Sequence, residues 1–228
     1  HVRRLSFPLP SGSKTIGPRK LHNSQWGFVC PSESPDGGNV GIINHLSIMA
    51  KVTSNINSDS ILEVLDDLNY IPLYAINTND FDHKCKIFIN GKWVGIHFNP
   101  DIIYKVLRLY KLNSIINIHT SIVWDTVLNE MYISTTSGRI IRPLFVLRED
   151  RTNSLIGGDL SLIKEWNRAI HGYLYELLDK DISIYDDVYH KDIVDNLKSS
   201  HKDYLDFLER KQAVIEYIDP SEANTSLI

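Results

Sequence analysis

The sequence of 228 residues has few of the residues that build disulfide frameworks, zinc sites or membrane spans. Its only two cysteines, Cys30 and Cys85, lie 55 positions apart, which excludes a disulfide framework and a CxxC metal motif. No apolar run approaches the roughly 20 residues that cross a bilayer. The stretch 140–147, for example, is interrupted by Arg142 and Pro143. We therefore expect an intracellular protein in a reducing compartment, without membrane contact.

Motifs that carry chemistry are also missing. There are nine histidines, but none in HExxH or HxH spacing, and there is no Walker loop and no GxGxxG. His97 and His119 are expected to be structural or surface side chains, and Asp186-Asp187 to belong to a solvated loop. Gly37-Gly38 could approach a phosphate, but a single glycine pair is weak evidence. The residues thus predict neither a catalytic centre nor a bound metal in this chain.

Cys30 is the only conceivable nucleophile in a loop of interest. Thiolate catalysis needs a base and a setting that lowers the thiol pKa. His22 and Arg19 are near in sequence, which says little about distance in space. A small, buried, apolar role before Pro31 is the favoured interpretation, while a Cys-dependent hydrolase remains an open alternative.

Charge is distributed unevenly along a chain of ordinary globular composition, with 43% hydrophobic and 23% charged residues. Residues 1–50 hold five Lys and Arg against two acids, a net charge of +3, and residues 1–32 contain no acid. Residues 51–228 hold 19 bases and 26 acids, a net charge of −7. A basic end on an acidic body indicates a polyanionic partner on one side. A merely solvated basic tail is the alternative.

Composition also divides the chain into two parts, 1–50 and 51–228. The first part is rich in Pro, Gly, Ser and Asn, with short apolar runs. Such a segment cannot bury itself, so we expect its packing partners to lie mostly elsewhere, and the segment to be mobile or docked on a neighbouring molecule. Asp36-Gly37-Gly38 predicts a tight turn, because glycine tolerates positive φ. The chain as a whole is interpreted as a piece of a longer protein.

The second part predicts an α+β fold with mixed helices and short antiparallel sheets. Ser58 or Asp59 can cap a short helix, and Asn90-Gly91 predicts a hairpin between β-rich runs. Asn99 followed by Pro100 predicts the start of another helix. The inward face of the first helix is predicted to consist of Ile61, Leu62, Leu65 and Leu68. In the second helix the predicted inward side chains are Ile102, Ile103, Val106, Leu107 and Tyr110. The predicted outward side chains of the second helix are Lys105, Arg108 and Lys111.

Further elements are predicted towards the C-terminus. Leu160, Ile163, Trp166, Ile170, Leu174 and Leu177 recur at helical spacing, which predicts a helix of about 20 residues. Residues 181–199 are acidic and aromatic. The remaining expectations are strands over 122–127, 131–134, 139–147 and 214–218, a polar connection over 148–158, and a helix over 200–212.

The basic residues of the first part flank a loop that contains Gly and Pro. Arginine suits phosphate because its guanidinium can donate two parallel hydrogen bonds. Several such side chains on a constrained loop form a surface that follows a nucleic-acid backbone. We call this set the basic strip, and its members are Arg3, Arg4, Lys14, Arg19 and Lys20.

Four stretches of the first part carry a specific resemblance: HVRRLS at 1–6, PRKLHNSQWG at 18–27, VCPSESPDG at 29–37 and GIIN at 41–44. Together they resemble the second-largest subunit of multisubunit DNA-dependent RNA polymerases, of the eukaryotic type. Sparser landmarks agree in order: INGKWVG at 89–95, GRIIRPLF at 138–145 and EYID at 216–219. The resemblance spans the chain and is dense only at its beginning.

The resemblance implies a role for each part. Residues 1–50 are similar to the fork region beside the DNA–RNA hybrid, and residues 51–228 to the peripheral domain called external 2. The fork loop would comprise Ser11, Gly12, Ser13, Lys14, Thr15, Ile16 and Gly17. The family adds nucleotides to an RNA 3′ end as a DNA-directed RNA polymerase, a nucleotidyltransferase of transcription. Its Mg²⁺ and its structural Zn²⁺ are bound by other parts of the enzyme, so this chain alone should be inactive.

The resemblance can be followed residue by residue. Arg4 matches a family arginine near the hybrid, and Arg19 and Lys20 match the basic pair that leaves the fork loop. A structural loop near the active centre would contain Glu33, Pro35, Asp36 and Gly37. The family usually has Glu where this chain has Asp36, which puts the reach of that carboxylate in doubt.

The resemblance also implies partners: the largest polymerase subunit, the rest of the second-largest subunit, the DNA template and the RNA transcript, and no membrane. The Asn- and Ile-rich composition suggests a divergent lineage, such as a large nucleocytoplasmic DNA virus. Viral transcription would place the protein in host cytoplasm or virion, and a cellular source would place it in the nucleus. A non-catalytic nucleic-acid or protein-binding module is the alternative function.

Overall fold

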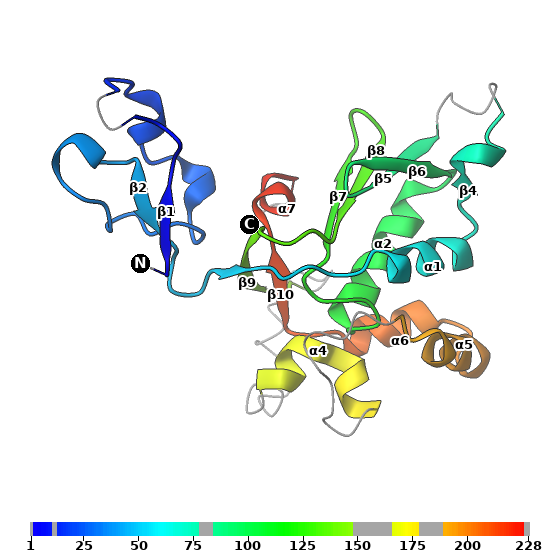
Figure 1. Cartoon of the computed structure of the whole chain (residues 1–228). Helices are drawn as coiled ribbons and strands as arrows, with labels where there is room; N and C mark the ends of the chain where they lie inside the picture. The colour runs from blue at the N-terminus through cyan, green and yellow to red at the C-terminus, as the bar shows by residue number, and fades with distance from the viewer. Residues whose placement is uncertain (1, 11–12, 78–83, 148–165, 178–188, 226–228) are drawn as a thin grey trace.

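A computed structural model describes residues 2–10, 13–77, 84–147, 166–177 and 189–225. Within these ranges the chain forms helices and three small, mostly antiparallel sheets (Figure 1). The predicted α+β class is therefore confirmed. None of the described helices is both long and apolar enough to cross a membrane.

The first part of the chain contains a two-stranded antiparallel sheet, β1 (Arg4–Ser6) with β2 (Ile43–His45), drawn in blue in Figure 1. A third stretch joins the other edge of β2, because Cys30 N donates to the carbonyl of His45 at 2.8 Å. Short 3-10 turns lie at Gly17–Arg19, Asn23–Gln25 and Gly37–Asn39. Gly37 has a φ of 78°, so the turn predicted at Asp36-Gly37-Gly38 is confirmed.

The largest sheet has the strand order β4-β6-β5-β8-β7. Its strands are β4 (Ile71–Pro72), β5 (Cys85–Ile89), β6 (Lys92–His97), β7 (Ser121–Asp125) and β8 (Glu130–Ser134). The β5–β8 pair is parallel and the other pairs are antiparallel. A parallel pair needs a crossover connection, and α2 (Pro100–Leu112) lies in the chain between these two strands.

One face of this sheet packs on α1 (Asp59–Asp67) and α2 and forms the main core. Alternation along β5 places Cys85, Ile87 and Ile89 inward, all fully or nearly fully buried. The predicted hairpin at Asn90-Gly91 is confirmed, and both residues have positive φ. Strong periodicity therefore located these elements to within one or two residues.

Two positions on α2 and two caps differ from expectation. Ile102 is 55% exposed where an inward side chain was predicted, and Lys111 is 2% exposed where an outward one was predicted. Ser58 makes no capping hydrogen bond; instead Asn57 Oδ1 accepts from Asp59 N at 3.1 Å. The side chain of Asn99 does not cap α2 either, although the helix does begin at Pro100.

A smaller antiparallel sheet has the order β10-β9-β3, with β3 (Lys51–Val52), β9 (Ile140–Phe145) and β10 (Ile215–Ile218). Every residue of β10 is buried. The chain passes from β10 into the short helix α7 (Pro220–Thr225), which packs on β7. The smaller sheet thus joins the beginning of the second part of the chain to its end.

The remaining helices are α4 (Trp166–Leu177), α5 (Lys191–Ser200) and α6 (Tyr204–Lys211). Non-helical backbone at Gly172 interrupts α4, and Trp166 and Leu177 at its two ends are exposed. The predicted helix over 200–212 corresponds to α6, which begins at Tyr204, whereas α5 was not predicted. Residues 148–165 and 178–188, including Leu160, Ile163 and Asp186-Asp187, lie outside the described residues.

Candidate nucleic-acid interface

Arg4 lies at the start of β1 with an exposed side chain, and its backbone pairs with that of His45. Among the described residues no hydrogen bond or ion pair engages its guanidinium. Strand geometry fixes the direction of the side chain. Because the guanidinium is exposed to solvent, its five N–H donors are available to a ligand. Arg4 is therefore the member of the basic strip that is best placed to bind an external anion.

The other members of the basic strip differ in how far they are engaged. Lys14 and Lys20 are exposed. Arg3 donates from Nη2 to the carbonyl of Leu46, so part of its guanidinium serves the fold. In the predicted fork loop, Ser11 and Gly12 lie outside the described residues, and the hydroxyls of Ser13 and Thr15 are 2.8 Å apart.

Arg19 connects the fork loop to the turn at 37–39. Its Nη1 donates to the carbonyls of Gly38 and Val40, at 2.8 and 2.9 Å, and its Nη2 donates to the carbonyl of Ser13 at 2.7 Å. The guanidinium thus joins two backbone segments, the fork loop at Ser13 and the turn at 38–40, through three neutral acceptors. A contact with nucleic acid remains a prediction for Arg19, but its replacement would also disturb the loop.

The predicted structural loop around Glu33 is held by its neighbours. Ser34 Oγ accepts from Gly41 N at 2.9 Å and lies 3.2 Å from the carbonyl of Ile43, to which it donates. The carboxylate of Glu33 is 3.9 Å from His45 Nδ1, and Pro35, Asp36 and Gly37 continue the turn. These contacts hold the loop against β2, the strand that pairs with β1, on which Arg4 lies.

Cys30 shows no geometry for thiolate catalysis. It is partly buried, and its backbone pairs with β2. Within the described ranges its thiol has no hydrogen bond to a histidine or other base. The Cys-dependent hydrolase, left open by the sequence, gains no support from the structure.

A buried charge network lies in the second part of the chain, and the sequence did not reveal it. Lys111 Nζ is 2.8 Å from Glu222 Oε1 and 3.6 Å from Glu216 Oε1. Arg108 donates to Glu216 at 2.9 Å, while Arg139 is 3.3 Å from Asp219. Glu216 in an otherwise apolar strand was the available signal, because buried charges are almost always paired.

This network neutralises itself. Burial by itself lowers the pKa of Lys111, but the carboxylates of Glu222 and Glu216 raise it above its usual value. Burial raises the pKa of Glu216, but Lys111 and Arg108 bring it below its ordinary value. Each carboxylate therefore already has a cation, which does not suit a divalent metal. No group of three or more metal-ligating side chains lies together among the described residues.

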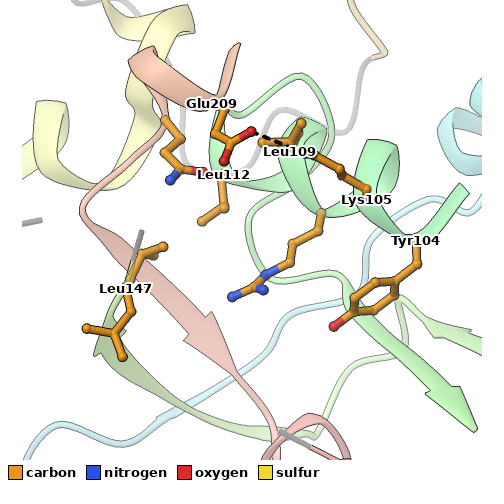
Figure 2. A pocket seen from close by; sticks show the side chains of 9 residues that line it. Tyr104, Lys105, Leu109, Leu112, Leu147 and Glu209 are labelled. Carbon is orange, nitrogen blue, oxygen red and sulfur yellow. Dashed lines mark ion pairs between the residues drawn. The ribbon is translucent and has the colours of Figure 1, made fainter. Parts of the chain in front are cut away.

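A cavity of about 150 Å³ opens between α2, α6 and the end of β9 (Figure 2). Apolar side chains including Leu109, Leu112 and Leu147 line it, and Lys105 and Glu209 form an ion pair of 3.3 Å at its edge. Its charged groups are paired with one another or with β10. We interpret this cavity as a gap between packed elements, because the described residues that line it contain no reactive centre.

Comparison with known families places both parts of the chain. Residues 1–52 match the model described as RNA polymerase Rpb2, domain 3, and residues 87–148 match RNA polymerase Rpb2, domain 4. The chain belongs to the family of RNA polymerase second-largest subunits. The Rpb2 domain 3 match contains the whole basic strip, and the domain 4 match contains most of the β5–β6 hairpin, α2 and β9.

Individual Rpb2 relatives are similar over most of the chain. The DNA-directed RNA polymerase II subunit RPB2 of Encephalitozoon cuniculi is 33% identical over 78% of this chain, and that of Meyerozyma guilliermondii is 30% identical over the full length of this chain. A viral relative, DNA-directed RNA polymerase subunit 2 of Acanthamoeba polyphaga mimivirus, is 31% identical over 67% of the chain. The chain spans 16%, 17% and 13% of these relatives, respectively.

Proposed function

We propose that this chain contributes a nucleic-acid-contacting segment and a peripheral structural domain to a DNA-directed RNA polymerase. The observation that carries the proposal is Arg4, an exposed arginine held on β1 without a partner among the described residues, in the part that matches Rpb2 domain 3. A side chain so placed can contact the phosphates of a DNA–RNA hybrid. The enzyme acts in transcription, inside the cell or the virion.

The chain's partners under this proposal are the largest subunit, the rest of the second-largest subunit, the DNA template and the RNA transcript. Nucleotide addition needs Mg²⁺; the buried carboxylates Glu216, Glu222 and Asp219 are paired with cations, and no three metal-ligating side chains lie together among the described residues, so these residues do not fit that metal. We propose that Mg²⁺ and a structural Zn²⁺ are bound by other parts of the polymerase. The chain by itself then has no polymerase activity.

The test is Arg4→Ala in the complete polymerase that contains this chain, assembled on a DNA–RNA hybrid. The lifetime of the complex is measured across a series of KCl concentrations. Loss of one phosphate contact should lower the slope of log complex lifetime against log salt concentration by about one unit. Thermal stability should not change, since the side chain is exposed and makes no hydrogen bond or ion pair with the described residues.

Lys92→Ala is the matched control, because Lys92 is equally exposed but lies at the β5–β6 hairpin, in the acidic part of the chain. It should leave the salt slope unchanged. An Arg4→Ala enzyme that melts earlier but keeps the parental salt slope would contradict the proposal. Arg19 is less suitable for this test because its three carbonyl contacts would mix stability with binding.

A further inference from the structure

Arg142 makes an unusual contact between the two parts of the chain. It lies in β9, where its backbone pairs with Ile218 of β10, and so belongs to the second part. Its guanidinium carbon lies 5.2 Å from the centre of the Phe28 ring, which belongs to the first part and is 3% exposed. A guanidinium over an aromatic face is attracted by the ring electrons and packs its flat surface there.

The backbone of the first part is shaped to admit this side chain. Gly27 has a φ of 77°, and a Cβ added there would lie 2.2 Å from Arg142 Nη1 and 2.8 Å from Arg142 Cδ. The arginine thus occupies the space where a side chain at position 27 would lie. Glycine is required for both reasons, the left-handed backbone and the closeness of Arg142.

Among the described residues, no acid explains why Arg142 lies partly buried here. Within the described residues no carboxylate pairs with Arg142, and its Nε is buried without a hydrogen-bond partner. Partial burial lowers the pKa of Arg142 below its usual value. Burying an unpaired polar donor costs free energy. The contacts of the Arg142 side chain with Phe28 and Gly27 offset this cost.

A second contact also joins the two parts. The 3-10 turn at Asn23–Gln25 packs on α7, which is fixed to the second part because Glu222 bonds Lys111 and Ile122 N. Residues 47–50 are the covalent connection between β2 and β3. Arg142 and α7 are therefore two separate points at which the first part rests on the second.

We infer that Arg142 is a positioning residue that fixes the orientation of residues 1–50 on residues 51–228. Its consequence for nucleic acid, that β9 sets the direction in which Arg4 points, rests on the proposed function. The docking itself does not. Without the guanidinium, a gap opens beside Phe28 and Gly27, and the segment pivots about residues 47–50.

The test measures the distance between two spin labels in the full chain without nucleic acid. Labels are attached at Thr15→Cys and Val127→Cys, both exposed positions, with Cys30→Ser to remove the accessible native thiol; Cys85 is fully buried. We expect a narrow distance distribution in the parent. Arg142→Leu should broaden it at least twofold, and Arg142→Lys should restore it only in part, since lysine lacks the planar group.

Two further variants keep the test decisive. Gly27→Ala leaves β9 intact and should broaden the distribution as Arg142→Leu does, and the double variant should add little, because both remove one contact. Arg210→Leu, at an exposed arginine on α6, is the matched control and should stay narrow. Narrow distributions in both Arg142→Leu and Gly27→Ala would overturn the inference. That result would leave the salt-slope test of Arg4 untouched.

Discussion

Lys111 is held between two buried carboxylates, with Arg108 completing a set of two cations and two anions. The cost of removing these charges from water is offset only while all of them are present. Lys111→Met should therefore lower the free energy of unfolding by about 3–5 kcal/mol, since Glu216 and Glu222 lose a partner. Urea unfolding monitored by circular dichroism measures this.

Lys105→Met provides the comparison on the same helix. Lys105 pairs with Glu209 at 3.3 Å but is largely solvated, so its loss should cost less than about 1 kcal/mol. The double variant Lys111→Met/Glu222→Gln should recover part of the loss. If Lys111→Met and Lys105→Met are equally mild, the network does not stabilise the fold as its geometry indicates.

His119 introduces a pH dependence through burial. Burial, together with the nearby cations Lys51, Lys111 and Arg139 and with His171, lowers its pKa to about 4. The unfolded chain binds the proton more readily, with a pKa near 6.5. Stability from neutral His119 is therefore complete above about pH 6.5 and is lost as pH falls from there towards 4.

The size of this effect is at most about 3 kcal/mol, from the difference between the two pKa values. Replacing the titrating group by His119→Gln should flatten the decline of unfolding free energy between pH 6.5 and 4. His190→Gln, at the N-terminus of α5, serves as control. Equal slopes in parent and His119→Gln would show that other groups govern acid unfolding.

Among the strands, β4 depends on a glycine of its neighbour. A Cβ at Gly95 would lie 2.2 Å from the carbonyl oxygen of Ile71 and 2.9 Å from the Tyr70 ring, so β4 can pair with β6 only because residue 95 has no side chain. Gly95→Ala should cost about 1–3 kcal/mol and speed amide exchange in β6 at the β4 edge.

Gly17→Ala is the matched substitution, because nothing lies within 4 Å of a Cβ built there. It should change stability by less than about 0.5 kcal/mol, as expected for a surface site. An unchanged exchange rate in Gly95→Ala would mean that β4 can shift without loss. The edge of the sheet would then be more adaptable than its close contacts indicate.

For the molecule as a whole, the two parts have separate cores. The main apolar cluster begins at Ile61 and contains no residue of the first part, whereas Phe28, Ile42 and Leu46 are buried around the small β1–β2 sheet. A chain starting at Lys51 should therefore keep the near-UV circular dichroism signal of a folded protein and should unfold cooperatively on heating. A molten product that binds ANS would contradict the boundary at 50/51.

Periodicity and turn chemistry were enough to predict much of the fold. The Asn90-Gly91 hairpin, the start at Pro100 and the strand before Asp219 depend on neighbours a few residues away, which the sequence displays directly. Helix α5 was missed because its acidic, aromatic surroundings resemble a loop. The kink at Gly172 was missed because its cause is a backbone approach to Leu112 and Ala213, distant in sequence.

The amino-acid sequence by itself determined the family, the α+β class and the basic strip, because these are written in local motifs and in charge order. Only the tertiary structure decided what each charge does. Lys111 lies inside because β10 and α7 bring two carboxylates to it, Arg19 is drawn to three carbonyls, and Arg4 is left facing solvent. The physical reason is that a charge's environment depends on groups brought close by folding, which spacing along the chain does not encode.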